Sequence, residues 1–136
     1  MAQEIKRGRD ASSQALACLG DSGLEISIRQ RIVRECECNA EELNKRSKAV
    51  TNARTQARIA DLLQDVLTEE ELAVYKRGRN LKSLTAPKSC SISEYRRATG
   101  LEALMGYLYL EGRQERIDEL IDTAAGQITQ NETNES

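Results

Sequence analysis

The chain contains one proline and no tryptophan or phenylalanine among its 136 residues, and this narrows the folds open to it. A hydrophobic core must be built from leucine, isoleucine, valine and alanine, a set that favours helices. A chain of this length forms one domain that buries roughly two-thirds of its unfolded surface. We predict an all-helical bundle of about six or seven helices over residues 1–128, and a disordered tail over 129–136.

Capping residues mark the starts of three helices, because their side chains accept from an N–H group three residues further on. The predicted helices run from Asn39 to about Val50, from Thr68 to about Arg77, and from Ser91 to near Leu110. Apolar residues at helical spacing predict two more, over 53–67 and around 117–124. Gly78 and Gly112 stand where a helix C-terminus takes a left-handed residue, so we expect helices to end there.

Residues 24–32 allow two interpretations. Alternate residues of 24–28 are apolar, as in a strand, whereas Leu24, Ile28 and Ile32 lie four apart, as on a helix face. We predict a helix, because a single strand would have no partner in this chain. Residues 79–90 form a long polar connection that contains the proline, and such a loop in a compact domain is usually functional.

Charge is distributed unevenly along the chain, although its net charge is only −2. Residues 76–97 contain seven basic residues and one acidic residue, whereas the sequence on both sides is acidic overall. A basic block of this kind indicates contact with a polyanion such as a nucleic acid. The alternative interpretation is an ordinary solvated basic loop.

Histidine is absent, which excludes Ser-His-Asp triads, Cys-His pairs and zinc sites that contain histidine. An enzyme of this composition would rely on carboxylates or cysteines. We interpret Cys18, Cys36, Cys38 and Cys90 as structural thiols, with a tetrathiolate metal site as the alternative. No segment has the apolar run of a signal peptide or membrane span, so we expect a cytoplasmic location.

Several motifs resemble a known family. The run ALACLGD at 15–21 resembles the start of the ribonuclease III catalytic domain, in which a helix begins at Gly-Asp and the Asp is a metal ligand. KRGRN at 76–80, PK at 87–88, YR at 95–96 and TGLEALMGYLYL at 99–110 follow in the order and spacing of Mini-ribonuclease III, the compact bacterial branch of that family. The resemblance covers residues 12–122 and implies the helical bundle of the ribonuclease III catalytic domain.

The resemblance also implies that Asp21 and Glu102 are catalytic ligands of Mg²⁺, with Mn²⁺ as a substitute. Both acids stand in mostly apolar segments, where an unpaired carboxylate is costly to bury, and together they would suit a hard cation. On a phosphodiester such a cation activates water and neutralises developing charge. Without the resemblance, Asp21 would be interpreted as a helix N-terminal anion and Glu102 as a surface charge.

Other carboxylates of ribonuclease III enzymes are missing from this chain. Gln14, Ala17 and Thr99 occupy their positions, as is common in the compact branch, and this leaves the number of bound metal ions open. Glu25 lies one helical turn after Asp21, and we interpret it as a structural partner rather than a ligand.

The basic block is the expected RNA-binding surface, because too few residues follow the last predicted helix for a separate RNA-binding domain. Lysine and arginine would contact phosphates, while A-form shape and 2′-hydroxyls select RNA over DNA. The candidate residues are Lys76, Arg77, Arg79, Asn80, Lys82, Lys88 and Arg96.

Cutting both strands of a duplex requires two sites, which the family supplies as a homodimer. We expect a homodimer here, because the helix around 101–110 has more than one apolar face, enough for its own core and for a partner.

The sequence therefore predicts a Mg²⁺-dependent endoribonuclease that cleaves double-stranded RNA. The resemblance implies a role in maturation of large-subunit (23S) ribosomal RNA, with a ribosomal protein as a further partner. The first alternative is a non-catalytic RNA-binding or ribosome-assembly factor with the same fold. The second is a helical protein-interaction adaptor.

Overall fold

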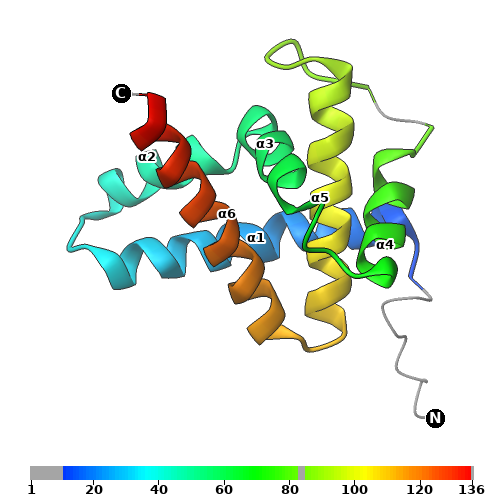
Figure 1. Cartoon of the computed structure of the whole chain (residues 1–136), viewed down its shortest axis with the longest axis horizontal. Coiled ribbons are helices and arrows are strands. Elements are labelled where there is room, and N and C mark those ends of the chain that lie inside the picture. The colour runs from blue at the N-terminus through cyan, green and yellow to red at the C-terminus, as the bar shows by residue number, and fades with distance from the viewer. Residues whose placement is uncertain (1–10, 83–84, 136) are drawn as a thin grey trace.

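The structure, a computed structural model, describes residues 11–82 and 85–135, and in these ranges it is all-helical with six helices, as predicted. They are α1 (Ser13–Glu35), α2 (Ala40–Val50), α3 (Ala53–Leu63), α4 (Glu69–Arg79), α5 (Ile92–Leu110) and α6 (Gln114–Glu135) (Figure 1). Residues 24–32 lie inside α1, so the helical interpretation of this segment is confirmed. None of the described helices is both long and apolar enough to cross a membrane.

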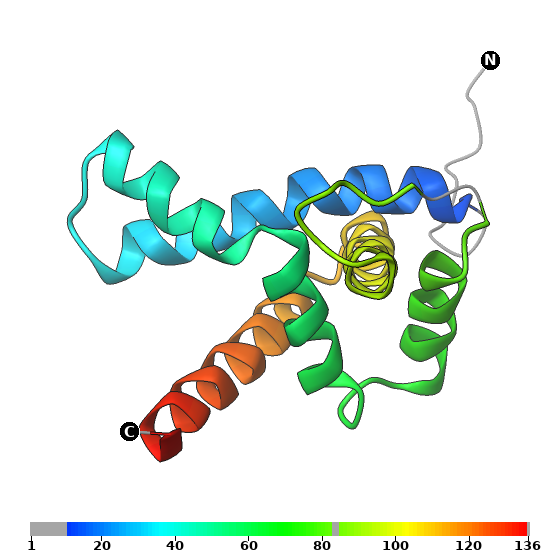
Figure 2. The ribbon, with the colours of Figure 1, turned by 90° about the horizontal axis from the view of Figure 1, so that it is seen from above.

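Helix α5 is the centre of the fold. Figure 2 shows it end-on, with α1, α3, α4 and α6 arranged around it. Ten of its residues are buried, and they occupy every side of the helix, which is the pattern of a helix enclosed by its own chain. Among the apolar residues expected to serve both the core and a partner subunit, Leu104 and Leu108 are fully buried within this chain, whereas Leu110 is 40% exposed.

The predicted capping residues begin three of the helices. Asn39 caps α2, while Thr68 and Ser91 form complete capping boxes at the starts of α4 and α5. Each box satisfies two backbone N–H groups that the helix itself leaves without a partner. These starts could be located from the sequence because the interactions are local.

The two predicted helix-ending glycines behave differently. Gly112 follows α5 with a φ of 71°, the left-handed conformation that was expected. Gly78 does not end a helix, because it is buried inside α4, where an added Cβ would lie 2.6 Å from the Cβ of Ala103. The missing side chain of Gly78 allows α4 to pack closely against α5, and α4 continues to Arg79.

The contact between α1 and α5 is made backbone to backbone. A Cβ added at Gly20 would lie 1.6 Å from the carbonyl oxygen of Glu102, and one at Gly106 would lie 1.9 Å from that of Leu16. Only glycine permits so close an approach. The crossing fixes the side chains that flank these glycines relative to one another.

Helix α6 is anchored by apolar residues and by one ion pair. Ile117, Leu120 and Ala124 are buried, and Arg116 binds Glu71 of α4. The helix continues to Glu135, across the segment 129–135 for which composition indicates no stable structure. Once a docked helix has formed, each added residue contributes a further hydrogen bond, so propagation costs little.

Candidate functional site

The crossing of α1 and α5 brings Asp21 and Glu102 into contact. Asp21 is exposed on α1, directly after Gly20, and Glu102 is half-buried on α5. Burial, a hydrogen bond with Asp21 and the negative charge of Asp21 together raise the pKa of Glu102 to about 8, and burial is the largest of the three causes. The Glu102 carboxyl therefore holds a proton near neutral pH and donates it to the Asp21 carboxylate.

Two expectations about these acids are corrected by their positions. Asp21 lies in the interior of α1, which begins at Ser13, so no helix begins at the Gly-Asp pair and the helix N-terminus does not stabilise this charge. Glu102 is not a surface charge, because α1 covers part of it. Among the residues that the structure describes, neither acid forms an ion pair with a lysine or arginine.

The two acids face an open cavity of about 400 Å³ between α1, α3 and α5. Its walls combine small apolar residues with uncharged polar ones. The lining residues are Gln14, Ala17, Cys18, Asp21, Thr51, Ala53, Gln56, Leu81, Tyr95, Ala98, Thr99 and Glu102. The three positions at which the sequence lacks a family carboxylate, 14, 17 and 99, all lie on this cavity, so it contains two carboxylates rather than more.

The donor set fits Mg²⁺. This ion is held by one or two carboxylates together with waters and substrate phosphate oxygens, and it needs no closed cage of protein ligands. Asp21 and Glu102 supply two carboxylates without a competing cation, and Glu102 holds a proton that a cation can replace. Within residues 11–82 and 85–135 no group of three or more metal-ligating side chains occurs.

The cysteines are free and dispersed. Cys18 lies on the cavity, Cys36 and Cys38 lie between α1 and α2, and Cys90 precedes α5. These cysteines lie in three separate places, so the four thiols do not form one cluster. The structure therefore does not support the tetrathiolate metal site.

Gln56 is a cavity residue that the sequence interpretation missed. It lies on α3 and is only 4% exposed, yet it is polar. The sequence contains a sign of this position, because Gln56 falls three residues after Ala53 and four before Ala60, on the apolar stripe that predicts this helix. A polar residue on a buried stripe indicates either an internal partner or a site.

A basic groove of about 440 Å³ lies where α4 ends and α5 begins. Its lining residues are Arg79, Asn80, Ile92, Ser93, Arg96 and Arg97. Arg79 stacks on the ring of Tyr75, 5.7 Å from its centroid, and its Nε donates to Asn80 Oδ1 at 3.2 Å. The groove adjoins the cavity of Asp21 and Glu102. That cavity is lined by Leu81 and Tyr95, which are the chain neighbours of the groove residues Asn80 and Arg96.

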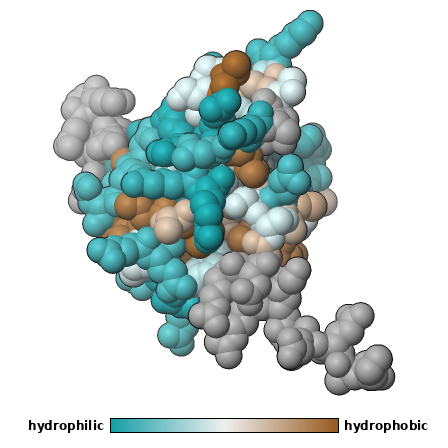
Figure 3. Space-filling view, turned by 90° about the vertical axis from the view of Figure 1, so that its right-hand side faces the viewer, coloured by the Kyte–Doolittle hydropathy of each residue, from teal (hydrophilic) through white to brown (hydrophobic). Residues whose placement is uncertain are grey.

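The remaining basic candidates are exposed around this groove. Lys76 and Arg77 lie in the last turn of α4, and Lys82 and Lys88 lie on the connection to α5. In the described part of the chain these four have no ion-pair partner, whereas Arg97 pairs with Asp61. Figure 3 shows the face that includes α4, which is mainly hydrophilic with small apolar patches.

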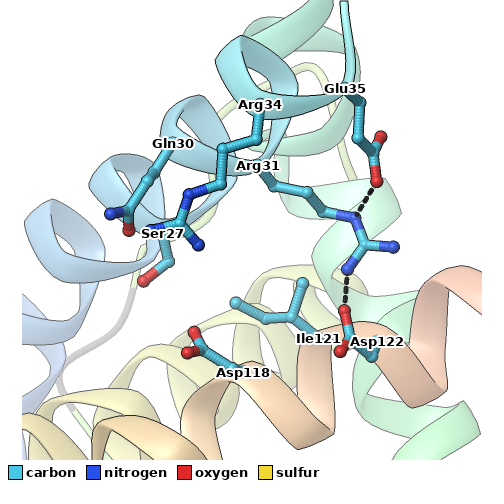
Figure 4. Close-up of a pocket in the computed structure, with 8 residues that line it drawn as sticks. All are labelled: Ser27, Gln30, Arg31, Arg34, Glu35, Asp118, Ile121 and Asp122. Carbon is cyan, nitrogen blue, oxygen red and sulfur yellow. Dashed lines mark hydrogen bonds and ion pairs between the residues drawn. The ribbon is translucent and has the colours of Figure 1, made fainter.

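A second polar pocket, of about 290 Å³, lies between α1 and α6 (Figure 4). Arg31 bridges Glu35 and Asp122 across it, so two of its three acids have a cationic partner within the chain. Glu25 is paired similarly, with Arg29 at 3.0 Å, which agrees with its interpretation as a structural partner. The paired acids differ from Asp21 and Glu102, which have no lysine or arginine partner in the part of the chain that the structure describes.

The chain is similar to known proteins over most of its length. The sequence profile described as "Ribonuclease III domain" matches residues 14–113. The chain is 42% identical to "Mini-ribonuclease 3" of Symbiobacterium thermophilum over 110 residues, which are 81% of this chain and 85% of that protein. It is also 42% identical over 123 residues to "Mini-ribonuclease 3" of Enterococcus faecalis, covering 89% and 92% of the two chains. A crystal structure of a Fusobacterium nucleatum protein superimposes with a TM-score of 0.79 at 36% identity, over 90% of this chain and 98% of that one.

Proposed function

Because the chain belongs to the ribonuclease III family, we propose that it is an endoribonuclease that hydrolyses phosphodiester bonds in double-stranded RNA. The observation that carries the proposal is the meeting of Asp21 and Glu102 in an open cavity beside a basic groove. The two acids come from different helices, and α1 and α5 approach closely enough only because Gly20 and Gly106 have no side chains. The carboxylates are therefore held in place by the fold.

Asp21 and Glu102 are the proposed ligands of Mg²⁺, for which Mn²⁺ can substitute. When bound, such an ion activates water and neutralises charge on the transferred phosphoryl group. Glu102 would release its proton on loading, because both carboxylates then face a positive charge. The chain has no histidine, so the groups on this cavity that can accept or donate a proton are the two carboxyl groups, the Cys18 thiol and the Tyr95 hydroxyl.

The groove supports binding of the duplex backbone. Arg79, Asn80 and Arg96 line it, and Lys76, Arg77, Lys82 and Lys88 surround it without carboxylate partners in the described part of the chain. Free cations of this kind neutralise phosphates and position a duplex without reading its sequence. Arg97 is a weaker candidate because Asp61 already balances its charge.

A homodimer would supply the second site that cleavage of both strands requires. Since α5 is covered by its own chain, the support for this now comes from α1. Leu19, Ile26 and Val33 lie seven residues apart on α1 and are 43%, 65% and 59% exposed. Two helical turns separate each pair, so the three form one exposed apolar stripe, and the same stripe on a second copy is its natural complement.

The proposed substrate is the duplex of a large-subunit (23S) ribosomal RNA precursor, as the resemblance of the sequence motifs to Mini-ribonuclease III implies. The chain is also 42% identical to proteins of that name over most of its length. A ribosomal protein is a proposed further partner in that reaction. Maturation of this RNA would take place in the cytoplasm.

The proposal is tested by substituting the two acids. Asp21→Asn and Glu102→Gln keep the size of each side chain and remove its charge. We expect each to lower the cleavage rate of a long RNA duplex in Mg²⁺ by at least about a thousandfold, because the site then lacks an anionic ligand. Gel analysis of duplex RNA with and without Mg²⁺ measures this loss, and Glu25→Gln is the matched control, with near wild-type cleavage.

Binding of the same duplex separates an enzyme from an RNA-binding factor. We expect Asp21→Asn and Glu102→Gln to retain RNA affinity. Simultaneous neutralisation of Arg77, Arg79 and Lys82 should weaken RNA binding and reduce the slope of log affinity against log salt concentration by the equivalent of about three phosphate contacts. Wild-type protein that binds duplex RNA but never cleaves it would identify the non-catalytic alternative. Absence of RNA binding at low salt would instead favour a protein-interaction adaptor.

A further inference from the structure

Gln56 is only 4% exposed, yet its side-chain amide still reaches solvent through the cavity, because Ser47 Oγ is the one fully covered side-chain polar atom without a partner among the described residues. The backbone N–H of Gln56 is used within α3, where it donates to Asn52 at 2.9 Å, but among the residues that the structure describes no group accepts from or donates to the side-chain amide. Buried polar side chains in folded proteins are almost always hydrogen-bonded. Gln56 lines the cavity of Asp21 and Glu102, so the missing partner can arrive with a bound molecule.

Two threonine hydroxyls on this cavity are already occupied. The hydroxyl of Thr51 donates to the carbonyl oxygen of Ser47 at 2.9 Å, and that of Thr99 donates to Tyr95 at 2.9 Å. Both threonines therefore direct their donors into their own helices. Gln56 remains as an amide whose donor and acceptor both serve the cavity.

The position of Gln56 is rigid. Its neighbours on α3, Ala57 and Ala60, are buried to within 2% of full coverage, and Asn52 caps the helix one turn earlier. A side chain on a packed helix is held more precisely than one on a loop, which is the requirement for reading a substrate group.

The chemistry of the amide selects among the groups that RNA offers. A phosphate oxygen only accepts, so it would satisfy the Gln56 Nε2 donor and leave the Oε1 acceptor alone. A ribose hydroxyl both donates and accepts, so it can satisfy both atoms. The amide is also neutral, so it does not form an ion pair with the nearby carboxylates as lysine or arginine would.

We propose that Gln56 binds a ribose 2′-hydroxyl of a nucleotide next to the scissile phosphate and so selects RNA over DNA within the cleavage site. This inference rests on the proposed function, since it requires an RNA duplex to reach the cavity. The Gln56 contact would recognise the sugar, whereas the basic groove binds phosphates independently of sequence. Gln56 is a substrate-binding residue in this role and takes no part in proton transfer.

The experiment uses two duplexes that differ in one feature. One is all RNA, and the other carries 2′-deoxyribose at the two nucleotides flanking the bond that wild-type protein cleaves. We expect wild type to bind and cleave the deoxy duplex about tenfold less well, and Gln56→Leu to treat both duplexes alike, at the lower level. Binding is measured by titration without divalent metal, and cleavage by initial rates in Mg²⁺. Gln64→Leu, a change of the same residue type on the same helix segment outside the cavity, should keep the wild-type ratio.

Two results would overturn the inference. One is a Gln56→Leu variant that keeps the wild-type preference for the all-RNA duplex. The other is a clear fall in its thermal midpoint, since an amide without a protein partner should be replaceable by leucine at equal or greater stability. Gln56→Met serves as a second, more flexible apolar variant if leucine does not fit. Failure of wild type to cleave the all-RNA duplex would instead count against the proposed function itself.

Discussion

Glu71 and Glu102 are both glutamates covered by neighbouring helices, yet their pKa values move in opposite directions. At the contact of α4 with α6, Glu71 is 0% exposed, and burial alone would raise the pKa of its carboxyl. Hydrogen bonds from Arg116 and from the Thr68 N–H outweigh burial and lower the pKa of Glu71 instead. At the crossing of α1 with α5, burial and the adjacent Asp21 together raise the pKa of Glu102 to about 8.

The difference separates a structural carboxylate from a functional one. Glu71 has a complete set of partners, and Arg116 also donates to the carbonyl oxygen of Val66 at 2.8 Å. Glu102 has a second acid as its partner, which is unfavourable until a cation or a proton is present. A fold that satisfies one buried carboxylate so fully and leaves another with a like-charged neighbour marks the second as a binding site.

The largest expected effect comes from removing the crossing itself. Gly20→Ala places a Cβ 1.6 Å from the carbonyl oxygen of Glu102, and backbone atoms cannot move aside as a side chain can. We expect a loss of at least about 4 kcal/mol in the free energy of unfolding. Urea unfolding measures it. Gly126→Ala is the matched control, because it lies on α6 with nothing within 4 Å and should be neutral or stabilising by about 0.5 kcal/mol.

An intermediate effect is expected at the α4–α6 contact. Arg116→Met leaves Glu71 buried without its cationic partner, and we expect a loss of about 3 kcal/mol in the free energy of unfolding at neutral pH. The double variant Glu71→Leu with Arg116→Met should recover most of this loss, since no charge is then left uncompensated. Arg29→Met, at a partly exposed pair with Glu25, should cost less than about 1 kcal/mol and serves as the control. A neutral Arg116→Met would contradict the structural role of the pair.

The smallest effect is the pH dependence of stability without divalent metal. The pKa of Glu102 is raised from 4.5 to about 8 in the folded protein, so the folded state binds more protons than the unfolded state between these values. Stability should therefore fall as pH rises from about 5 to 8 through this group. Glu102→Gln removes the effect, and we expect the variant to match wild type in stability at pH 4 and to exceed it increasingly as the pH rises to 8.

Glu71 should show the opposite sign. Because its pKa is lowered from 4.5 in the folded state, its contribution is complete above pH 4.5 and is lost as pH falls below that value. Urea unfolding of wild type, Glu71→Gln and Glu102→Gln across this range would resolve the two contributions. Parallel curves for the two variants would show that the comparison between these glutamates is wrong.

Part of the candidate site could be predicted from the sequence. Asp21 and Glu102 were found from their motifs, and Arg79, Asn80 and Arg96 from the charge block, because runs of neighbouring residues carry both signals. Gln56 was missed, since its meaning depends on which residues of α1 and α5 lie opposite α3. The balanced charge of Arg97 was also missed, because Asp61 lies on another helix.

Local interactions in the sequence determine the helices of this protein: caps such as Thr68 and Ser91 satisfy backbone groups within one turn, and an all-round apolar segment must become the central helix. The tertiary structure alone decides that Gly20 and Gly106 are contact points, that Gly78 lies within a helix, and that α1 has an exposed apolar stripe while most of α5 is buried. The physical reason is distance along the chain. Packing, burial and the electrostatic pairing of Glu102 with Asp21 depend on residues from helices that are remote in sequence, and no local pattern records which of them will meet.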